Sequence, residues 1–275
     1  VSASHLADCA AMSDPSTFDK KQAVLKNVFG FPNFRPGQEA VVDALLSGKD
    51  VLAVMPTGSG KSLCYQIPAL VLGGLTIVVS PLVALMQDQV SALQLTGVLA
   101  GTINSSRDRS DNIAVWRRAA AGELRLLYLS PERLMTDRML GAITRLKVDL
   151  IVIDEVHCIS QWGPAFRPEY EDLTRLKTLF PEVPIAALTA TADEVTRSDI
   201  AARLFPKRPP RVFVAEFDRP NIHLSVEMRR DWKQQLMALV STHADESGIV
   251  YCLSRRKTED IAAFLADQGV TALPY

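Results

Sequence analysis

The sequence predicts an α/β fold in which helices cover both faces of a parallel β-sheet. Short apolar runs alternate along the chain with longer segments whose apolar residues recur at helical spacing. The runs are apolar throughout, which is typical of parallel strands that are buried on both faces. Polar clusters directly follow several of these runs, at the carboxyl edge where such sheets bind ligands. These three observations predict one parallel sheet with one ligand-binding edge.

The elements expected before residue 205 follow from these patterns in chain order. The first helix stops at Gly30, and Ser130-Pro131 supplies a cap and a first-turn proline for a later helix. Thr191 and Glu194 have the spacing of a capping box. The predicted helices span residues 18–29, 38–46, 62–72, 85–95 and 107–121, and the predicted strands span residues 51–54, 75–79, 124–129, 149–153 and 184–188.

Near residues 205–210 the composition becomes rich in proline and basic residues, and a second α/β unit is expected to begin. Its predicted elements are strands at 211–216 and 222–226, a helix from Asp231, a strand at 248–252 and a helix capped by Ser254. We therefore expect a flexible extension at 1–17, a first domain at 18–210, an interdomain joint at 211–230 and the start of a second domain at 231–275. A remnant of about 50 residues buries too little surface to stand alone. The chain is thus expected to be a fragment, or its tail packs on the first domain.

Composition narrows the class of protein. The 275 residues are 48% apolar, which suits one large α/β domain or one domain with part of another. The net charge of −1 gives no bulk argument for nucleic acid, so such binding has to come from local patches. The four cysteines form no close pair and no metal-ligand spacing, which indicates free thiols.

Two features of the sequence bear on location. Residues 67–86 carry no charge, but Pro68, Gly73 and Pro81 divide this run, so we expect no membrane-spanning helix. The first 14 residues lack the basic start and apolar core of a signal peptide, and Met12 is a candidate initiator. We expect a soluble protein.

A strand, a glycine turn and a helical segment in succession predict a phosphate-binding loop. Gly58 and Gly60 let the backbone curl so that successive N–H groups point at one anion, and the helix adds the positive end of its dipole. Lys61 can reach the β- and γ-phosphates, and the Ser62 hydroxyl can ligate Mg²⁺. Nucleotide contacts are predicted for Thr57, Gly58, Ser59, Gly60, Lys61 and Ser62. The alternative, a glycine turn with a solvated lysine, is much less favoured in this context.

Two carboxylates follow the apolar run at residues 149–153. Asp154 closes that run, so its carboxylate can hold Mg²⁺ against Ser62. Glu155 can orient or deprotonate a water that attacks the γ-phosphate in line. An Asp-Glu pair after a strand is more often a solvated loop, but the phosphate loop some 90 residues upstream reverses that balance. Lys61, Asp154 and Glu155 are the predicted catalytic residues.

The segments around these residues resemble the sequence motifs of RecQ-family DNA helicases. The likeness runs from about residue 18 to residue 275, and Met55, where the general phosphate-loop pattern has glycine, is ordinary in that family. The matching segments are Phe34-Arg35-Pro36-Gly37-Gln38, residues 55–66, Ser80-Pro81-Leu82, residues 129–134, residues 154–163, residues 166–170, Thr189-Ala190-Thr191-Ala192, residues 217–221 and Val250-Tyr251-Cys252. The resemblance implies a RecA-like parallel sheet with helices on both faces, followed by an incomplete second RecA-like unit.

The resemblance also implies roles for single residues. Phe31 would stack on adenine, Gln38 would read the edge of the base and Arg35 would support the site. Without the family, Phe31 is better explained as a core residue at a helix end. Contacts with single-stranded DNA, or coupling of DNA to hydrolysis, are implied for His157, Gln161, Trp162, Phe166, Arg167, Thr189 and Thr191. A merely hydrogen-bonded histidine and a buried aromatic cluster are the alternatives for these residues.

Three departures from the family pattern affect the expected activity. Val156 stands where the family usually has alanine, and Pro164 and Ala165 stand where it commonly has His-Asp. Proline stiffens this loop, so we expect weaker transmission of DNA binding to ATP hydrolysis. The chain also ends before the part of the second motor domain that supplies an arginine to the γ-phosphate, and before the family's zinc-binding module, so no structural zinc is expected.

We therefore expect an ATP-dependent 3′–5′ DNA helicase of the RecQ type, active in DNA repair or recombination. As a fragment it should bind ATP, Mg²⁺ and single-stranded or partially duplex DNA but hydrolyse ATP poorly. A bacterial-type, cytoplasmic and nucleoid-associated location is expected. The alternatives are a non-catalytic ATP- or DNA-binding module and an RNA helicase of the wider superfamily. A small-molecule kinase is less favoured, because nothing in the sequence forms a second-substrate pocket.

Overall fold

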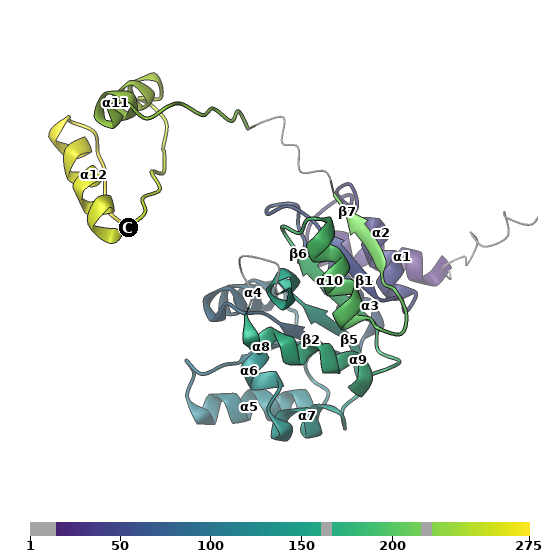
Figure 1. Ribbon diagram of the computed structural model, residues 1–275. Helices are drawn as coiled ribbons and strands as arrows, with labels where there is room; N and C mark the ends of the chain where they lie inside the picture. Colours follow the sequence, from purple (N-terminus) through teal and green to yellow (C-terminus); the bar gives the residue numbers. More distant parts are fainter. Residues whose placement is uncertain (1–14, 161–166, 216–221) are drawn as a thin grey trace, which may run out of the picture. The chain divides into compact units, whose positions relative to one another are not determined.

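The computed structural model describes residues 15–160, 167–215 and 222–275, and its chain divides into two compact units (Figure 1). The first unit comprises Val1–Asp218 and the second comprises Arg219–Tyr275. Several predicted features lie outside the described residues. They are residues 1–14 of the extension, the segment 217–221, and the loop that contains Gln161, Trp162, Pro164, Ala165 and Phe166. The predicted division into four parts stays a prediction.

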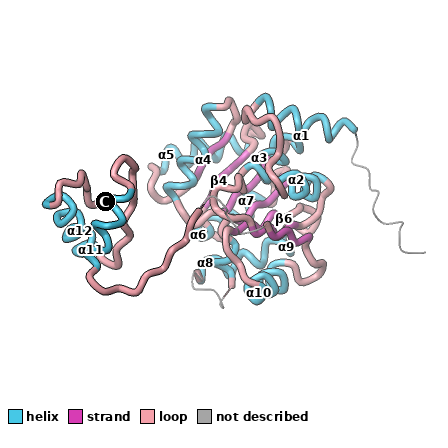
Figure 2. Tube along the Cα trace, turned by 90° about the horizontal axis from the view of Figure 1, so that it is seen from above, coloured by secondary structure: helices cyan, strands magenta, loops and turns pink. Residues whose placement is uncertain are grey.

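A sheet of seven parallel strands forms the centre of the first unit. The strand order is β3-β4-β2-β5-β6-β1-β7, and Figure 2 shows the strands in magenta with helices in cyan on both sides of them. The strands are β1 (Val51–Val54), β2 (Leu75–Val79), β3 (Ala100–Ile103), β4 (Leu126–Leu129), β5 (Val148–Ile153), β6 (Ile185–Thr189) and β7 (Arg211–Val214). The predicted α/β fold with a parallel sheet is confirmed.

Helices cover both faces of this sheet, as predicted. One face carries α2 (Gln38–Leu46), α3 (Leu63–Leu72) and α4 (Val83–Leu95), with α1 (Pro15–Asn27) packed against α2 and α3. The other face carries α5 (Arg109–Ala120), α6 (Pro131–Leu134), α7 (Asp137–Ile143), α8 (Pro168–Glu171), α9 (Leu176–Leu179) and α10 (Glu194–Leu204), with the 3₁₀ turns η1 (Val156–Ile159) and η2 (Asp172–Arg175). No helix of the described residues is long and apolar enough to cross a membrane.

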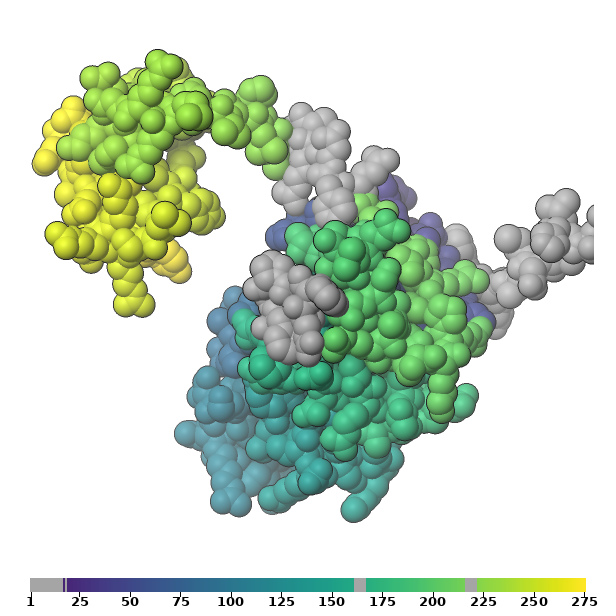
Figure 3. Space-filling model, in the orientation of Figure 1, coloured from purple at the N-terminus to yellow at the C-terminus, as the bar shows by residue number. Residues whose placement is uncertain are grey.

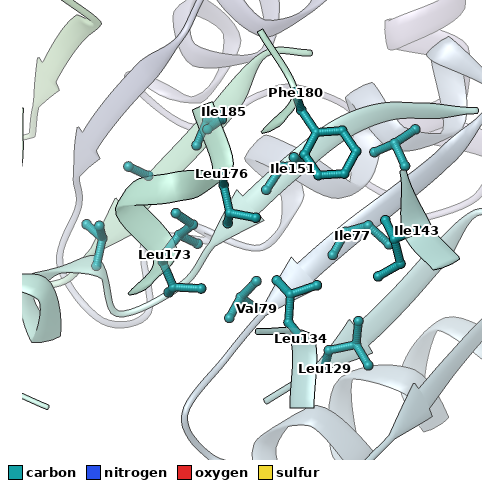
Figure 4. Close-up of a cluster of buried hydrophobic side chains, with 14 of the residues drawn as sticks. Ile77, Val79, Leu129, Leu134, Ile143, Ile151, Leu173, Leu176, Phe180 and Ile185 are labelled. Carbon is teal, nitrogen blue, oxygen red and sulfur yellow. The ribbon is translucent and has the colours of Figure 1, made fainter. Parts of the chain in front are cut away.

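The core consists of two layers because neighbouring residues of a strand point to opposite faces. On β2, Ile77 and Val79 belong to the layer under α5–α10, whereas Val78 belongs to the layer under α2–α4. Figure 4 shows part of the first layer, where strand residues meet helix residues. Its labelled residues are Ile77, Val79, Leu129, Leu134, Ile143, Ile151, Leu173, Leu176, Phe180 and Ile185.

A buried carboxylate joins β1 to its neighbours at the amino end of the sheet. Asp50 Oδ1 accepts hydrogen bonds from Ile185 N and from Lys177 Nζ, both at 2.9 Å. The Asp50 carbonyl also accepts the N–H of Arg211 at 2.8 Å. The side chain of Asp50 is only 7% exposed. This one residue therefore connects β1 with β6, β7 and α9.

Strand β7 lies at the end of the sheet and is partly exposed. It pairs with β1 along its whole length, from Val51↔Arg211 to Val54↔Val214. Val212 and Val214 are 50% and 47% exposed, and in Figure 3 the residues of α10 and β7, in green, form part of the surface of the first unit.

The structure differs from the prediction at several elements of the first unit, among them α8, α9, η1 and η2, which are absent from the prediction. Two of the differences have a clear physical cause. Strand β3 is absent from the prediction because Gly101 and Thr102 interrupt its apolar character. A Cβ on Gly101 would lie only 2.8 Å from Val115 Cγ1 on α5, so glycine at this position lets α5 approach the strand. The predicted capping box of Thr191 and Glu194 is wrong. The N-cap of α10 is Asp193, whose carboxylate accepts the N–H of Thr196 at 2.8 Å.

The second unit contains two helices, α11 (Trp232–Thr242) and α12 (Arg255–Asp267). The predicted cap of α12 is confirmed, since the side chain of Ser254 accepts the N–H of Lys257. Asp231, where the sequence predicts a helix to begin, is the N-cap of α11, and its side chain accepts the N–H groups of Lys233 and Gln234. The ring of Trp232 meets that of Phe264 edge-on, with centroids 5.5 Å apart. The predicted strands at 222–226 and 248–252 are wrong, because the described residues of this unit hold no strand with which they pair.

Candidate nucleotide-binding site

The loop between β1 and α3 has the curled backbone that its glycines predict. Gly58 and Gly60 have φ angles of 83° and 84°, in the left-handed region that favours glycine. A Cβ on Gly60 would lie 2.4 Å from Nε2 of Gln38, so a larger residue would displace that amide. Lys61 and Ser62 stand directly before α3, where free N–H groups and the helix dipole favour an anion.

The side chain of Gln38 clamps this phosphate loop. It is buried, and its Nε2 donates to Ser59 O and Gly60 O, both at 3.1 Å. Its Oε1 accepts the N–H of Arg35 at 2.8 Å. Both ends of the amide thus bind the protein backbone, and the predicted contact with adenine stays a prediction.

Replacement of Gln38 with alanine is expected to weaken ATP and GTP binding alike, by roughly tenfold, because it removes the hydrogen bonds that hold the loop at Ser59 and Gly60. Calorimetry with both nucleotides measures the two losses, and any additional loss for ATP measures a contact with the base. Gln22→Ala is the matched control, since Gln22 Nε2 also donates to a backbone carbonyl, that of Pro32 at 2.9 Å, but on an exposed surface. Unchanged affinity for both nucleotides in Gln38→Ala would contradict the clamp.

Arg35 and Phe31 lie on the segment before α2, and Arg35 contacts the phosphate loop. Arg35 Nη1 donates to Gly58 O at 2.5 Å. Phe31 is 43% exposed, so its ring is accessible to a base, as stacking requires. Thr57 is exposed on the same loop. The structure thus brings the predicted nucleotide contacts of the two segments together.

The two predicted catalytic carboxylates follow β5 at the same edge of the sheet. Asp154 N donates to Val79 O at 2.8 Å, which continues the pairing of β5 with β2. Glu155 is the one non-glycine residue with positive φ in the described part of the chain, with φ 51° and ψ 42°. This conformation costs about 1–3 kcal/mol and is characteristic of functional sites.

Their surroundings separate the pKa values of the two carboxyl groups. Burial, with the neighbouring charge of Glu155, raises the pKa of Asp154 to about 6, and Lys61 opposes that rise. The hydrogen bond from His157 and the charge of Lys61 lower the pKa of Glu155, although burial acts against them. Carboxyl pairs whose environments differ in this way are characteristic of functional sites.

His157 links Glu155 to the end of strand β6. Its Nδ1 lies 3.2 Å from Glu155 Oε2 and 2.7 Å from Thr189 Oγ1, and its Nε2 lies 3.8 Å from Cys158 Sγ. The contacts with Cys158 and then Glu155 raise the pKa of His157 to about 9, so the ring is an imidazolium at neutral pH. Thr189 O also accepts the N–H of Met55 at 2.9 Å. One strand end therefore connects the phosphate loop with the catalytic pair.

The donors at this edge fit a Mg²⁺ ion, which prefers hard oxygen ligands. Tyr65 interacts with both Ser62 and Asp154: burial, then Tyr128 and Asp154, raise the pKa of its hydroxyl, and a hydrogen bond with Ser62 opposes the rise. Ser80 follows β2 beside Asp154, and its buried Oγ has no partner among the described residues. Ser62 and Asp154 thus fit the role that the sequence predicts for them.

A cavity of about 750 Å³ opens beside this edge, where β2, β3 and β4 end. Four arginines line it, together with Trp116 and Asn104; they are Arg107, Arg109, Arg133 and Arg138. These arginines are absent from the predicted site residues, because they are scattered over 32 positions and only the fold gathers them.

Of the predicted DNA contacts, Arg167 lies against η1 through its N–H to Cys158 O at 3.0 Å, and Thr191 lies in the turn after β6, with its N–H on Thr189 Oγ1 at 3.3 Å.

Comparisons with known proteins identify the family. Residues 35–198 match the family model described as DEAD/DEAH box helicase. The ATP-dependent DNA helicase RecQ of Haemophilus influenzae is 50% identical over 253 residues, which cover 92% of this chain and 41% of that protein. The ATP-dependent DNA helicase Q-like 2 of Arabidopsis thaliana is 39% identical over 262 residues, with 90% and 37% covered. The chain thus spans about two fifths of the length of these curated relatives.

Solved structures show the same fold. The crystal structure of the DUF1998 helicase MrfA bound to DNA superimposes with a TM-score of 0.72 at 19% identity, over 92% of this chain and 39% of that one. A hypothetical ATP-dependent RNA helicase from Sulfolobus tokodaii gives a TM-score of 0.58 at 22% identity, over 89% and 71%. The RecA-like fold of the helicases is therefore confirmed, and so is the family resemblance seen in the motifs. The chain belongs to the DEAD/DEAH box helicases and, among them, to the RecQ family.

Proposed function

We propose that this chain is the ATP-binding motor part of a RecQ-type, ATP-dependent DNA helicase. One observation carries the proposal: strand β6, between β5 and β1, connects the catalytic pair with the phosphate loop. Its Thr189 binds His157 through the side chain and Met55 through the carbonyl. The end of β6 therefore fixes the position of the loop that would bind the nucleotide relative to the carboxylates that would act on its γ-phosphate.

The residues divide the chemistry of phosphoryl transfer between them. Lys61 and the N–H groups before α3 bind the phosphates, with Arg35 and Gln38 holding the loop in shape. Ser62 and Asp154 would hold Mg²⁺, which would supply positive charge to neutralise the phosphate oxygens. Glu155 orients and deprotonates the attacking water. Phe31 offers its ring to the adenine.

DNA binding is proposed along the carboxyl edge of the sheet. The arginines of the cavity beside β2, β3 and β4 provide phosphate contacts, and the loop after η1 adds contacts through Arg167. His157 shares its Nδ1 between Glu155 and Thr189. A nucleic acid that contacts this part of the chain would change whether His157 donates to Glu155 or to Thr189. It would thereby change whether the Glu155 carboxylate is available to the attacking water.

Hydrolysis by the 275-residue chain alone is proposed to be slow. Among the described residues, Lys61 and His157 are the cations whose charges act on Asp154 and Glu155. The family resemblance assigns a further arginine to a complete second motor domain. Such an arginine contributes about 10³–10⁵ to the turnover of related enzymes, so binding without efficient turnover is expected.

The experiment measures ATP binding by calorimetry, ATP turnover, and binding of labelled single-stranded DNA and RNA by fluorescence anisotropy. We expect ATP binding with Mg²⁺, a preference for DNA and little turnover. Arg133→Ala should weaken DNA binding and reduce the slope of its salt dependence by about 1, while Arg117→Ala, which is exposed on α5 and does not line the cavity, should not. Absence of nucleotide binding refutes the proposal. Equal stimulation of ATP turnover by RNA and DNA favours an RNA helicase. Robust DNA-stimulated ATP turnover contradicts the proposal that this chain alone hydrolyses ATP slowly.

A further inference from the structure

The side chain of Gln89 contacts the hydroxyl that is proposed to bind Mg²⁺. Gln89 lies on α4, 27 residues beyond Ser62, and its Nε2 donates to Ser62 Oγ at 3.2 Å. The residue belongs neither to the phosphate loop nor to any segment on which the family resemblance rests. Its contact with Ser62 therefore requires an explanation of its own.

A second glutamine fixes the orientation of this amide. Gln66 Nε2 donates to Gln89 Oε1 at 2.9 Å, and Gln66 is 5% exposed on α3. Because Gln66 supplies a donor, Gln89 has to present its oxygen to Gln66 and its nitrogen to Ser62. The Gln66 side chain is in turn hydrogen-bonded to Tyr128. The amide of Gln89 thus cannot turn round without loss of a hydrogen bond.

This arrangement determines how the serine hydroxyl points. A hydroxyl has one O–H donor and two acceptor lone pairs. The N–H of Gln89 occupies one lone pair of Ser62 Oγ. One lone pair remains, and it is the one that a cation can take.

We propose that Gln89 is a positioning residue that orients the Ser62 hydroxyl for Mg²⁺. It touches neither nucleotide nor metal and acts through Ser62 alone. The inference rests on the proposed function, since it takes a Mg²⁺–nucleotide complex as the ligand of Ser62. It adds a specific requirement to that function: the gain in nucleotide affinity that Mg²⁺ provides depends on a residue of α4.

The test compares ADP affinity by calorimetry in Mg²⁺ and in EDTA for the wild type and for Gln89→Met, which keeps the length of the side chain without its donor. We expect the gain from Mg²⁺ to fall by about 3- to 10-fold, the effect of one lost hydrogen bond. Affinity in EDTA should stay within about twofold of the wild type, because the phosphate loop is intact. This second value also reports that the variant is folded.

Gln94→Met is the matched control. Gln94 also lies on α4, and its Nε2 donates to Ala100 O at 3.0 Å, away from Ser62. Its replacement removes a hydrogen bond from the same helix and should leave the gain from Mg²⁺ unchanged.

A double-mutant cycle separates positioning from general destabilisation. In a Ser62→Ala background the residue through which Gln89 acts is gone, so Gln89→Met should have no further effect on the gain from Mg²⁺. An effect of equal size in both backgrounds, or a full gain in Gln89→Met, overturns the inference. If the wild type binds no ADP, or binds it equally with and without Mg²⁺, the proposed function fails instead.

Discussion

Replacement of Lys61 with alanine is expected to lower the affinity of the chain for ATP and ADP by a factor of about 10 to 100. The ammonium group supplies charge-assisted hydrogen bonds to the phosphates, worth about 1.5–3 kcal/mol. Lys61 also acts on the two carboxyl groups, because its charge lowers the pKa values of both Asp154 and Glu155. Calorimetry with each nucleotide in Mg²⁺ measures the loss.

Lys147→Ala is the control for this variant. The side chain of Lys147 is 84% exposed, directly before β5 at the amino end of the sheet, so its loss should leave nucleotide affinity unchanged. Lys61→Ala should lower the thermal stability of the nucleotide-free protein only slightly, since no ion pair among the described residues includes Lys61 and only its weaker attraction to Asp154 and Glu155 is lost. A Lys61→Ala protein that is stable and binds ATP as tightly as the wild type would rule out this loop as the phosphate site.

Replacement of Asp50 with alanine is expected to destabilise the first unit by about 3 kcal/mol. The change leaves the N–H of Ile185 and the ammonium of Lys177 without their shared acceptor, and removal of one partner of a buried pair is strongly destabilising. For a unit of this size the loss corresponds to a fall in Tm of roughly 6–12 °C. Thermal and urea denaturation of the nucleotide-free chain measure it.

Asp50→Asn should cost less than Asp50→Ala, because its amide oxygen can still accept from Ile185 N. Glu123→Ala breaks the exposed pair of Arg118 and Glu123, 3.2 Å apart, and should change stability by less than about 1 kcal/mol. If Asp50→Ala melts within a degree of Glu123→Ala, the buried carboxylate does not hold β1 to its neighbours.

Most of the first unit could be predicted because its strands are continuous apolar runs separated by glycine and proline. The runs that became β1 and β2 have the predicted limits. Strand β3 could not be predicted in this way, because Gly101 interrupts its apolar run. That glycine is needed for the close approach of α5 to the strand. The segments at 222–226 and 248–252 have the composition of strands but no pairing partner among the residues that the structure describes, and composition cannot supply one.

The phosphate loop, Asp154 and Glu155 could be predicted because each follows its strand directly in the sequence. The side chains that shape them come from elsewhere in the chain. Gln38 reaches the loop from 21 and 22 residues away, and Gln89 reaches Ser62 from 27. The left-handed backbone of Glu155 also has no signal in the sequence, because glutamate rarely adopts it. Contacts of this kind depend on the packing of α2 and α4 on the sheet.

The position of β1 between β6 and β7 has a consequence for how the protein folds. Its pairing partners lie about 135 and 160 residues further along the chain, from Val51↔Ala186 and Val51↔Arg211. Contacts between such distant segments form late, because the intervening chain has to lose its freedom first. A ribosome will therefore have released nearly the whole first unit before the strand that carries the phosphate loop is enclosed on both sides. Nucleotide binding should be among the last properties that a refolding molecule regains.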